Sequence, residues 1–145
     1  MGASNLDIMA LRGTVAVVAD DPDTLTALGT WLDQSGVKAS LHGSPESLVQ
    51  AITPASQPPL IRLQAHATEA HPLGCVLVDL TRPGVSGLTL AWALRGHHPH
   101  LPLVLITSEA PSRASRTGRL PPGIVSLQKP MDPHALKAAL LAALR

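Results

Sequence analysis

The sequence predicts an α/β fold built on a doubly wound, mainly parallel sheet of five strands. Four short segments are almost continuously apolar, at residues 15–19, 75–79, 103–107 and 124–127. Such runs are typical of strands that are covered on both faces of a parallel sheet. Segments with the leucine spacing of amphipathic helices separate the runs, and strands that alternate with helices need the crossover connections that make them parallel.

The first predicted strand, "VAVVA" at 15–19, leads into a helix with leucines at positions 25, 28 and 32. This i, i+3, i+7 spacing places the leucines on one face, and Gly36 stands where a C-terminal cap would end the helix. A second strand is expected at 37–41, "VKASL", where apolar and polar residues alternate. Because alternation indicates one exposed side, this strand is expected at an edge of the sheet.

The next helix is expected to begin at Ser44, an N-cap residue followed by a proline. Residues 53–73 interrupt the pattern with four prolines, so we expect an inserted surface loop there, with a short strand near residues 60–63. The third strand of the sheet is expected at 75–79, and Ser86 precedes the third helix.

The fourth strand is expected at 103–107 and the fifth at 124–127, with a degenerate fourth helix between them. Prolines in the segment 110–123, at positions 111, 121 and 122, leave room for a short helix only. The dipeptide Asp132-Pro133 begins the last helix, whose leucines recur on one face.

Acidic residues follow two of the predicted strands. Asp20 and Asp21 come directly after the first strand, and Asp79 ends the third. With a strand order of 2-1-3-4-5 these two strands are neighbours, so their carboxylates meet at the carboxyl edge of the sheet. Carboxylates this close repel one another unless a cation bridges them, and Mg²⁺ prefers such hard oxygen ligands. The alternative is that Asp20, Asp21 and Asp23 only cap the first helix, although capping needs no third carboxylate on a neighbouring strand.

Two further polar side chains lie at strand ends. Thr107 ends the fourth strand and presents a hydroxyl, while Lys129 follows the fifth and supplies a positive charge for a phosphate-like group. A carboxylate nucleophile, a divalent ion, a hydroxyl and an ammonium group are the equipment for phosphoryl transfer to aspartate.

The motifs "VVADD", "VDLTRPGVSGL", "VLITS" and "LQKP" follow one another in this order. In this the sequence resembles the receiver domain of two-component response regulators, over residues 14–145, with residues 1–13 left as an N-terminal arm. The resemblance implies a flavodoxin-like fold. It also implies that a histidine kinase donates the phosphoryl group and that an output domain, a partner protein or a second copy receives the signal.

The resemblance assigns a role to each residue of the predicted site. Asp79 would be the phosphoacceptor, and Asp20, Asp21 and Asp79 would hold Mg²⁺ together with the backbone carbonyl of Thr81. By the same resemblance Thr107 would be the switch hydroxyl and Lys129 would contact the phosphoryl group. Such a protein is no conventional enzyme, since it catalyses at most its own phosphorylation from a donor and its own slow dephosphorylation.

Two residues depart from the family pattern. Arg82 stands where the family usually has methionine, and Ser126 occupies the fifth-strand position that usually bears an aromatic switch. The chain contains neither phenylalanine nor tyrosine, so that switch cannot exist in its usual form. The sequence thus predicts that the residues of the chemical site are present, while the structural change that transmits the signal is altered.

Composition narrows the function further. A formal net charge of +1 leaves no basic excess with which to bind nucleic acid or an acidic membrane. The start of the chain lacks the pattern of a secretory signal, and no apolar run is long enough to span a membrane. A single cysteine, Cys75, lies in an apolar run, so the sequence predicts a cytoplasmic protein.

Two alternatives stay open from the sequence. One is a receiver-like interaction module that is regulated by binding alone, which the departure at Ser126 favours. The other is a phosphatase with an aspartate nucleophile, because "DDPDT" contains Asp21 and Asp23 in an Asp-x-Asp arrangement. The phosphatase ranks last, because few carboxylates follow downstream and the chain is short for a substrate cap.

Overall fold

The computed structural model describes residues 13–53, 59–62, 69–79, 87–107, 120–129 and 132–143. Within these residues the chain forms a sheet whose parallel part has the order β2-β1-β5-β6-β7. The strands are β1 (Thr14–Ala19), β2 (Ala39–His42), β5 (Ala70–Asp79), β6 (Leu103–Thr107) and β7 (Val125–Gln128). In chain order these are the five predicted strands, so the predicted order 2-1-3-4-5 is confirmed.

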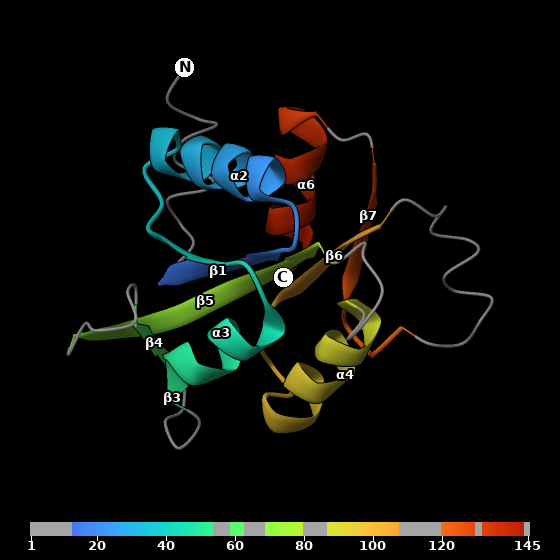
Figure 1. Cartoon of the computed structure of the whole chain (residues 1–145). Helices are drawn as coiled ribbons and strands as arrows, with labels where there is room; N and C mark the ends of the chain where they lie inside the picture. Colours follow the sequence, from blue (N-terminus) through green and yellow to red (C-terminus); the bar gives the residue numbers. More distant parts are fainter. Residues whose placement is uncertain are drawn as a thin grey trace.

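Helices cover both faces of this sheet (Figure 1). The four helices of the described residues are α2 (Pro22–Gln34), α3 (Pro45–Ala51), α4 (Gly87–His97) and α6 (Pro133–Ala143). One core cluster joins α2 and α6 to the sheet, and a second joins α3 and α4 to the opposite face. The central strands β1 and β5 are therefore buried on both sides, which explains their continuous apolar sequence.

Local sequence signals set the ends of the helices. Ser44 is the N-cap of α3, where its Oγ accepts a hydrogen bond from the backbone N–H of Ser47 at 3.2 Å. Gly36 follows α2 with a φ of +79°, a left-handed conformation that glycine adopts without strain. The N–H of Val37 then donates to the carbonyl of Leu32 at 3.0 Å and closes the helix end.

The insertion predicted at residues 53–73 contains more β-structure than expected: a strand at Leu60–Arg62 confirms the short strand predicted near 60–63, whereas the strand at Ile52–Thr53 and the strand structure of residues 70–73 were not predicted. Two short strands, β3 (Ile52–Thr53) and β4 (Leu60–Arg62), pair with each other in antiparallel fashion. β4 also pairs with the first residues of β5, which begins at Ala70 rather than at Cys75. Ile61 anchors this extension, because its side chain is fully buried in the core beneath α3 and α4.

The degenerate fourth helix was predicted at 110–123, and most of that segment lies outside the described residues. In its described part, residues 120–123 form a turn before β7. The edge strand predicted at 37–41 is β2, which begins two residues later than expected and lies at one edge of the parallel part.

Candidate functional site

The carboxyl ends of β1 and β5 bring the predicted acidic residues to one edge of the sheet. Asp79 is the last residue of β5 and pairs with Ala19, the last residue of β1. Asp20 and Asp21 follow Ala19 directly. The side chain of Asp79 is only 2% exposed, so this carboxyl group lies at the bottom of the site.

Lys129 follows β7, which is separated from β5 by β6, and its side chain contacts Asp79. Its Nζ lies 2.9 Å from Asp79 Oδ1, and its side chain is 30% exposed. The backbone N–H of Lys129 donates to the carbonyl of Thr107 at 2.8 Å, which ties the residue after β7 to the end of β6. Thr107 itself is half-buried at the end of β6. The structure therefore brings the side chain of Lys129 to Asp79 and the backbone of Lys129 to Thr107.

The environment of Asp79 opposes its ionisation. Burial raises the pKa of this carboxyl group, and the negative charges of Asp20 and Asp21 raise it further, while Lys129 acts in the opposite direction. The net direction is upward, so the positive charge of Lys129 alone does not balance the site. A second cation at this edge would favour the ionised, nucleophilic form of Asp79.

Asp21 has the structural role that its position in the sequence offered as the alternative to a metal site. It is the N-cap of α2, and its Oδ2 accepts hydrogen bonds from the backbone N–H of Thr24 at 3.3 Å and from Thr24 Oγ1 at 2.7 Å. The role of Thr24 was missed, although its position three residues after an aspartate is the ordinary spacing for such a bond. Both bonds use the same oxygen, so capping fixes the orientation of Asp21 at the edge of the site.

The donor set suits Mg²⁺, which binds oxygen and keeps several of its waters. Asp20, Asp21 and Asp79 offer only carboxylate oxygens. The negative charges of Asp20 and Asp21 disfavour a charge on Asp79, and a bound cation would relieve this repulsion. In the described part of the chain no group of three His, Cys, Asp or Glu side chains is arranged to hold a metal ion, so the three predicted carboxylates do not form a complete metal site by themselves. A bound Mg²⁺ would thus need water or a backbone oxygen besides these carboxylates.

Two predicted features lie outside the described residues, namely the carbonyl of Thr81 and the side chain of Arg82. Ser126 is described, on β7 opposite Leu105 of β6. Its Oγ is buried without a hydrogen-bond partner among the described residues. No aromatic ring occupies this position, as the sequence requires.

A shallow cavity of about 290 Å³ lies beside the acidic pair, between α2 and α6. Thr24, the partner of Asp21, lines it, and so does Asp132, whose Oδ1 accepts from the backbone N–H of Ala135 at 2.8 Å. The rest of the lining is apolar: Ala27, Leu28, Trp31, Pro133 and Leu136. The site therefore opens next to an apolar surface that a protein could contact.

Sequence comparison decides the family. Residues 15–141 match the family described as the response regulator receiver domain. The chain belongs to this family. It is 25% identical over 130 residues to the transcriptional regulatory protein FixJ of Azorhizobium caulinodans, a match that covers 90% of this chain and 54% of FixJ. This receiver domain thus spans about half the length of the curated relative it matches.

Solved structures share the fold of this receiver domain. The chemotaxis protein CheY4 of Vibrio cholerae superposes with a TM-score of 0.65 at 18% identity, covering 90% of this chain and 98% of CheY4. The BeF3-activated DrrB receiver domain gives a TM-score of 0.64 at 19% identity, covering 92% of this chain and 97% of that one. Among the described residues, no helix combines the length and the apolar character needed to cross a membrane.

Proposed function

We propose that this receiver domain accepts a phosphoryl group on Asp79 from a histidine kinase and signals through protein contacts. The observation that carries the proposal is the buried Asp79 carboxyl group, which contacts Lys129 and feels the charges of Asp20 and Asp21. Family membership supports this reading over the phosphatase alternative, and so does the capping role of Asp21.

In the proposed step, a carboxylate oxygen of Asp79 attacks the phosphorus of the donor phosphohistidine. A P–O bond to Asp79 forms, the P–N bond of the donor breaks, and the released imidazole takes up a proton. Lys129 lies close enough to hold an oxygen of the incoming group, because its ammonium already contacts Asp79. The hydroxyl of Thr107, at the end of the adjacent strand, is the second group expected to contact the phosphoryl oxygens.

We include Mg²⁺ in this proposal, held by the carboxylates of Asp20, Asp21 and Asp79 with the carbonyl of Thr81. The ion would supply positive charge that offsets the carboxylates and the transferred phosphoryl group. The partner's phosphohistidine must approach from the carboxyl edge of the sheet, and the apolar cavity beside Trp31 gives it a surface to contact. A cytoplasmic location, where such a kinase presents its phosphohistidine, belongs to the same proposal.

The experiment is intact-mass measurement after incubation with acetyl phosphate and Mg²⁺. We expect the mass of one phosphoryl group in the wild-type chain and none in Asp79→Asn, because the amide cannot act as the nucleophile. Asp33→Asn, which changes an exposed carboxylate on α2, is the matched control and should be phosphorylated like the wild type. Phosphorylation that survives Asp79→Asn would contradict the proposal.

A second candidate is a receiver domain that is regulated by binding alone. Ser126 favours it, because a side chain this small cannot fill or leave the space that an aromatic switch would use. A folded wild-type chain that binds Mg²⁺ but gains no phosphoryl mass would support this candidate instead.

A further inference from the structure

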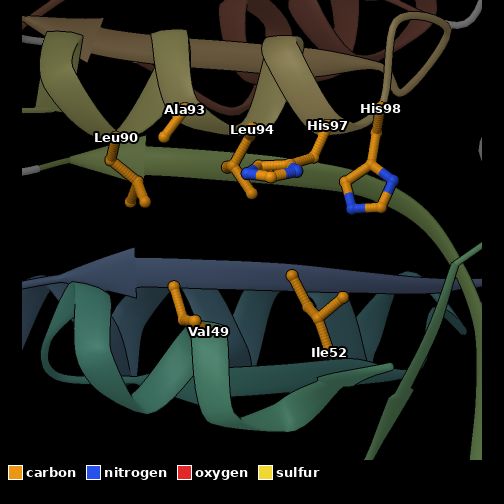
Figure 2. Close-up of a pocket in the computed structure, with 7 residues that line it drawn as sticks. All are labelled: Val49, Ile52, Leu90, Ala93, Leu94, His97 and His98. Carbon is orange, nitrogen blue, oxygen red and sulfur yellow. The ribbon is translucent and has the colours of Figure 1, made fainter. Parts of the chain in front are cut away.

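A second cavity, also of about 290 Å³, lies on the opposite face of the sheet from α2 and α6. α4 contributes one wall, and α3 with the start of β3 contributes the other (Figure 2). Its walls are aliphatic: Val49, Ile52, Leu90, Ala93 and Leu94. The cavity is thus suited to the apolar part of a small ligand.

This cavity extends toward the end of the parallel strands that is opposite to Asp79. α4 follows β5 along the chain and leads back to β6, which begins at Leu103, six residues after His97 at the end of α4. A ligand in the cavity would therefore be separate from the proposed phosphorylation site.

Among the described residues of the lining, the polar side chains are those of His97 and His98, which lie at one end of the cavity (Figure 2). His98 is only 5% exposed, and its Nδ1 is buried without a hydrogen-bond partner among the described residues. The backbone of His98 is fixed by two hydrogen bonds. Its N–H donates to the carbonyl of Leu94 at 2.8 Å, and its carbonyl accepts from Arg95 Nη1 at 3.2 Å. A buried ring nitrogen that lacks a hydrogen-bond partner, on a residue whose backbone is fixed, indicates that an additional group completes the site.

The side chains at the histidine end of the cavity determine which kind of ligand group fits there. The last turn of α4 and the residue after it carry Arg95, His97 and His98, and no carboxylate is among the described residues that line the cavity. Arg95 Nη1 is engaged with the backbone carbonyls of His98, Pro99 and Leu101. Arg95 Nε is buried without a partner among the described residues, but Arg95 is not one of the residues that line the cavity. The two imidazoles remain, and a carboxylate is the group that complements them, because it can accept from an imidazole N–H in either charge state of the ring.

We propose that this cavity binds a linear aliphatic monocarboxylate, with its chain against the aliphatic walls and its carboxylate against His97 and His98. The proposal is independent of phosphorylation. It makes the domain a sensor of a small acid as well as a receiver of a phosphoryl group.

The test is a titration of the full chain with butanoate, hexanoate and octanoate, followed by calorimetry and by amide chemical shifts. Each methylene that enters an apolar cavity should tighten binding about fourfold, so octanoate should bind roughly 15-fold more tightly than hexanoate. Shifts should concentrate in residues 48–53 and 87–98. Affinity that does not depend on chain length, or shifts elsewhere in the molecule, would overturn the proposal.

Matched variants test the two halves of the site. Ala93→Leu adds bulk to an exposed helix position that lines the cavity, and it should weaken octanoate binding at least tenfold. Ala138→Leu makes the same change at an exposed position of α6 and should leave binding unchanged. Equal effects of the two substitutions would show that octanoate does not occupy this cavity.

The head group is tested with His97→Gln and with octan-1-ol. The substitution should weaken octanoate binding severalfold, whereas His134→Gln, at an exposed position of α6, should not. Octan-1-ol should bind more weakly than octanoate to the wild-type chain. If the alcohol binds as tightly as the acid, the assignment of a carboxylate to the imidazole end is wrong.

Discussion

Asp79, the proposed phosphoacceptor, also affects the stability of the domain. Its carboxyl group is nearly completely buried, and the negative charges of Asp20 and Asp21 add to the cost of ionising it. Lys129, 2.9 Å away, offsets part of this cost. A raised pKa means that the folded protein holds the Asp79 proton more tightly than the unfolded chain does, so ionised Asp79 lowers stability at neutral pH.

Asp79→Asn should therefore stabilise the domain in the absence of Mg²⁺. The neutral amide has a similar shape and avoids the buried charge, and we expect the free energy of unfolding to rise by about 1 kcal/mol at neutral pH. Chemical denaturation of the wild type and the variant measures this. A lower stability of Asp79→Asn would mean that the contact with Lys129 outweighs the burial of the charge.

A buried hydrogen-bond chain on the other side of the molecule centres on His42. Ser40 Oγ donates to the carbonyl of Arg62 at 3.1 Å, so it must accept from His42 Nε2, which lies 2.6 Å away. His42 Nδ1, 2.8 Å from Ser47 Oγ, is then the acceptor of the Ser47 hydroxyl proton. This series of hydrogen bonds is complete only when the imidazole of His42 is neutral. Burial lowers the pKa of His42, which favours the neutral form.

Stability should consequently fall with acidification through the range where an unfolded histidine titrates. The unfolded chain binds a proton at His42 more readily than the folded protein, so the free energy of unfolding should decrease as the pH drops from about 7.5 to about 5.5. His98, whose pKa is lowered by burial and by His97, acts in the same direction.

Denaturation at several pH values checks this. His42→Gln should reduce the slope of stability against pH, while His134→Gln, at an exposed position, should not. A slope that is the same in all three proteins would show that His42 does not govern the acid sensitivity.

The residues of the site differ in how well the sequence predicts them. The positions of Asp79, Thr107 and Lys129 were predictable, because each stands at the end of an apolar run or just after it, and parallel strands end at one edge of the sheet. The bond from Ser40 to Arg62 was not, because it joins residues 22 positions apart through a strand that only tertiary packing creates. Local patterns therefore identify strand ends, while side-chain partners depend on the assembled sheet.

At the scale of elements, β5 is longer than its sequence suggests. The segment from Ala70 to Gly74 contains a histidine, a proline and a glycine, and it lacks the apolar run that marks residues 75–79. Pairing with β4 nevertheless makes it a strand, and the N–H of Leu73 donates to the carbonyl of Pro59 at 2.9 Å. A partner strand thus decides a conformation that local propensity leaves open.

The start of α2 combines a helix cap with an acidic site, and substitutions at Asp21 can separate the two roles. Asp21→Asn keeps an acceptor for Thr24 but removes the charge, so it should retain stability and lose much of the stabilisation by Mg²⁺. That stabilisation amounts to about 1.4 kcal/mol at a concentration tenfold above the dissociation constant. Asp21→Ala should lose the cap as well, at a further cost of about 1 kcal/mol.

Ser44→Ala is the matched control, because it removes the N-cap of α3 without touching the site. It should cost about 1 kcal/mol and leave the Mg²⁺ effect intact. Thermal unfolding with and without Mg²⁺ measures all four proteins. Full Mg²⁺ stabilisation in Asp21→Asn would show that Asp21 is a helix cap alone.

At the scale of the whole molecule, the sheet separates two regions. The parallel strands carry Asp79, Thr107 and Lys129 to the carboxyl edge, while β3, β4 and the first residues of β5 form an antiparallel extension at the other end (Figure 1). The aliphatic cavity between α3 and α4 reaches that other end. The strand order was predictable from the alternation of runs and helices, whereas the extension required knowledge of which strands pair.

The proposed function depends on Asp79 as the phosphoacceptor, and locating the phosphoryl group on the chain tests this. After reaction with acetyl phosphate and Mg²⁺, borohydride reduces an aspartyl phosphate to homoserine with release of phosphate, and peptide mass mapping finds the altered residue. We expect a single homoserine, at position 79. Homoserine at position 20 or 21, or none in a folded protein that binds Mg²⁺, would contradict the account.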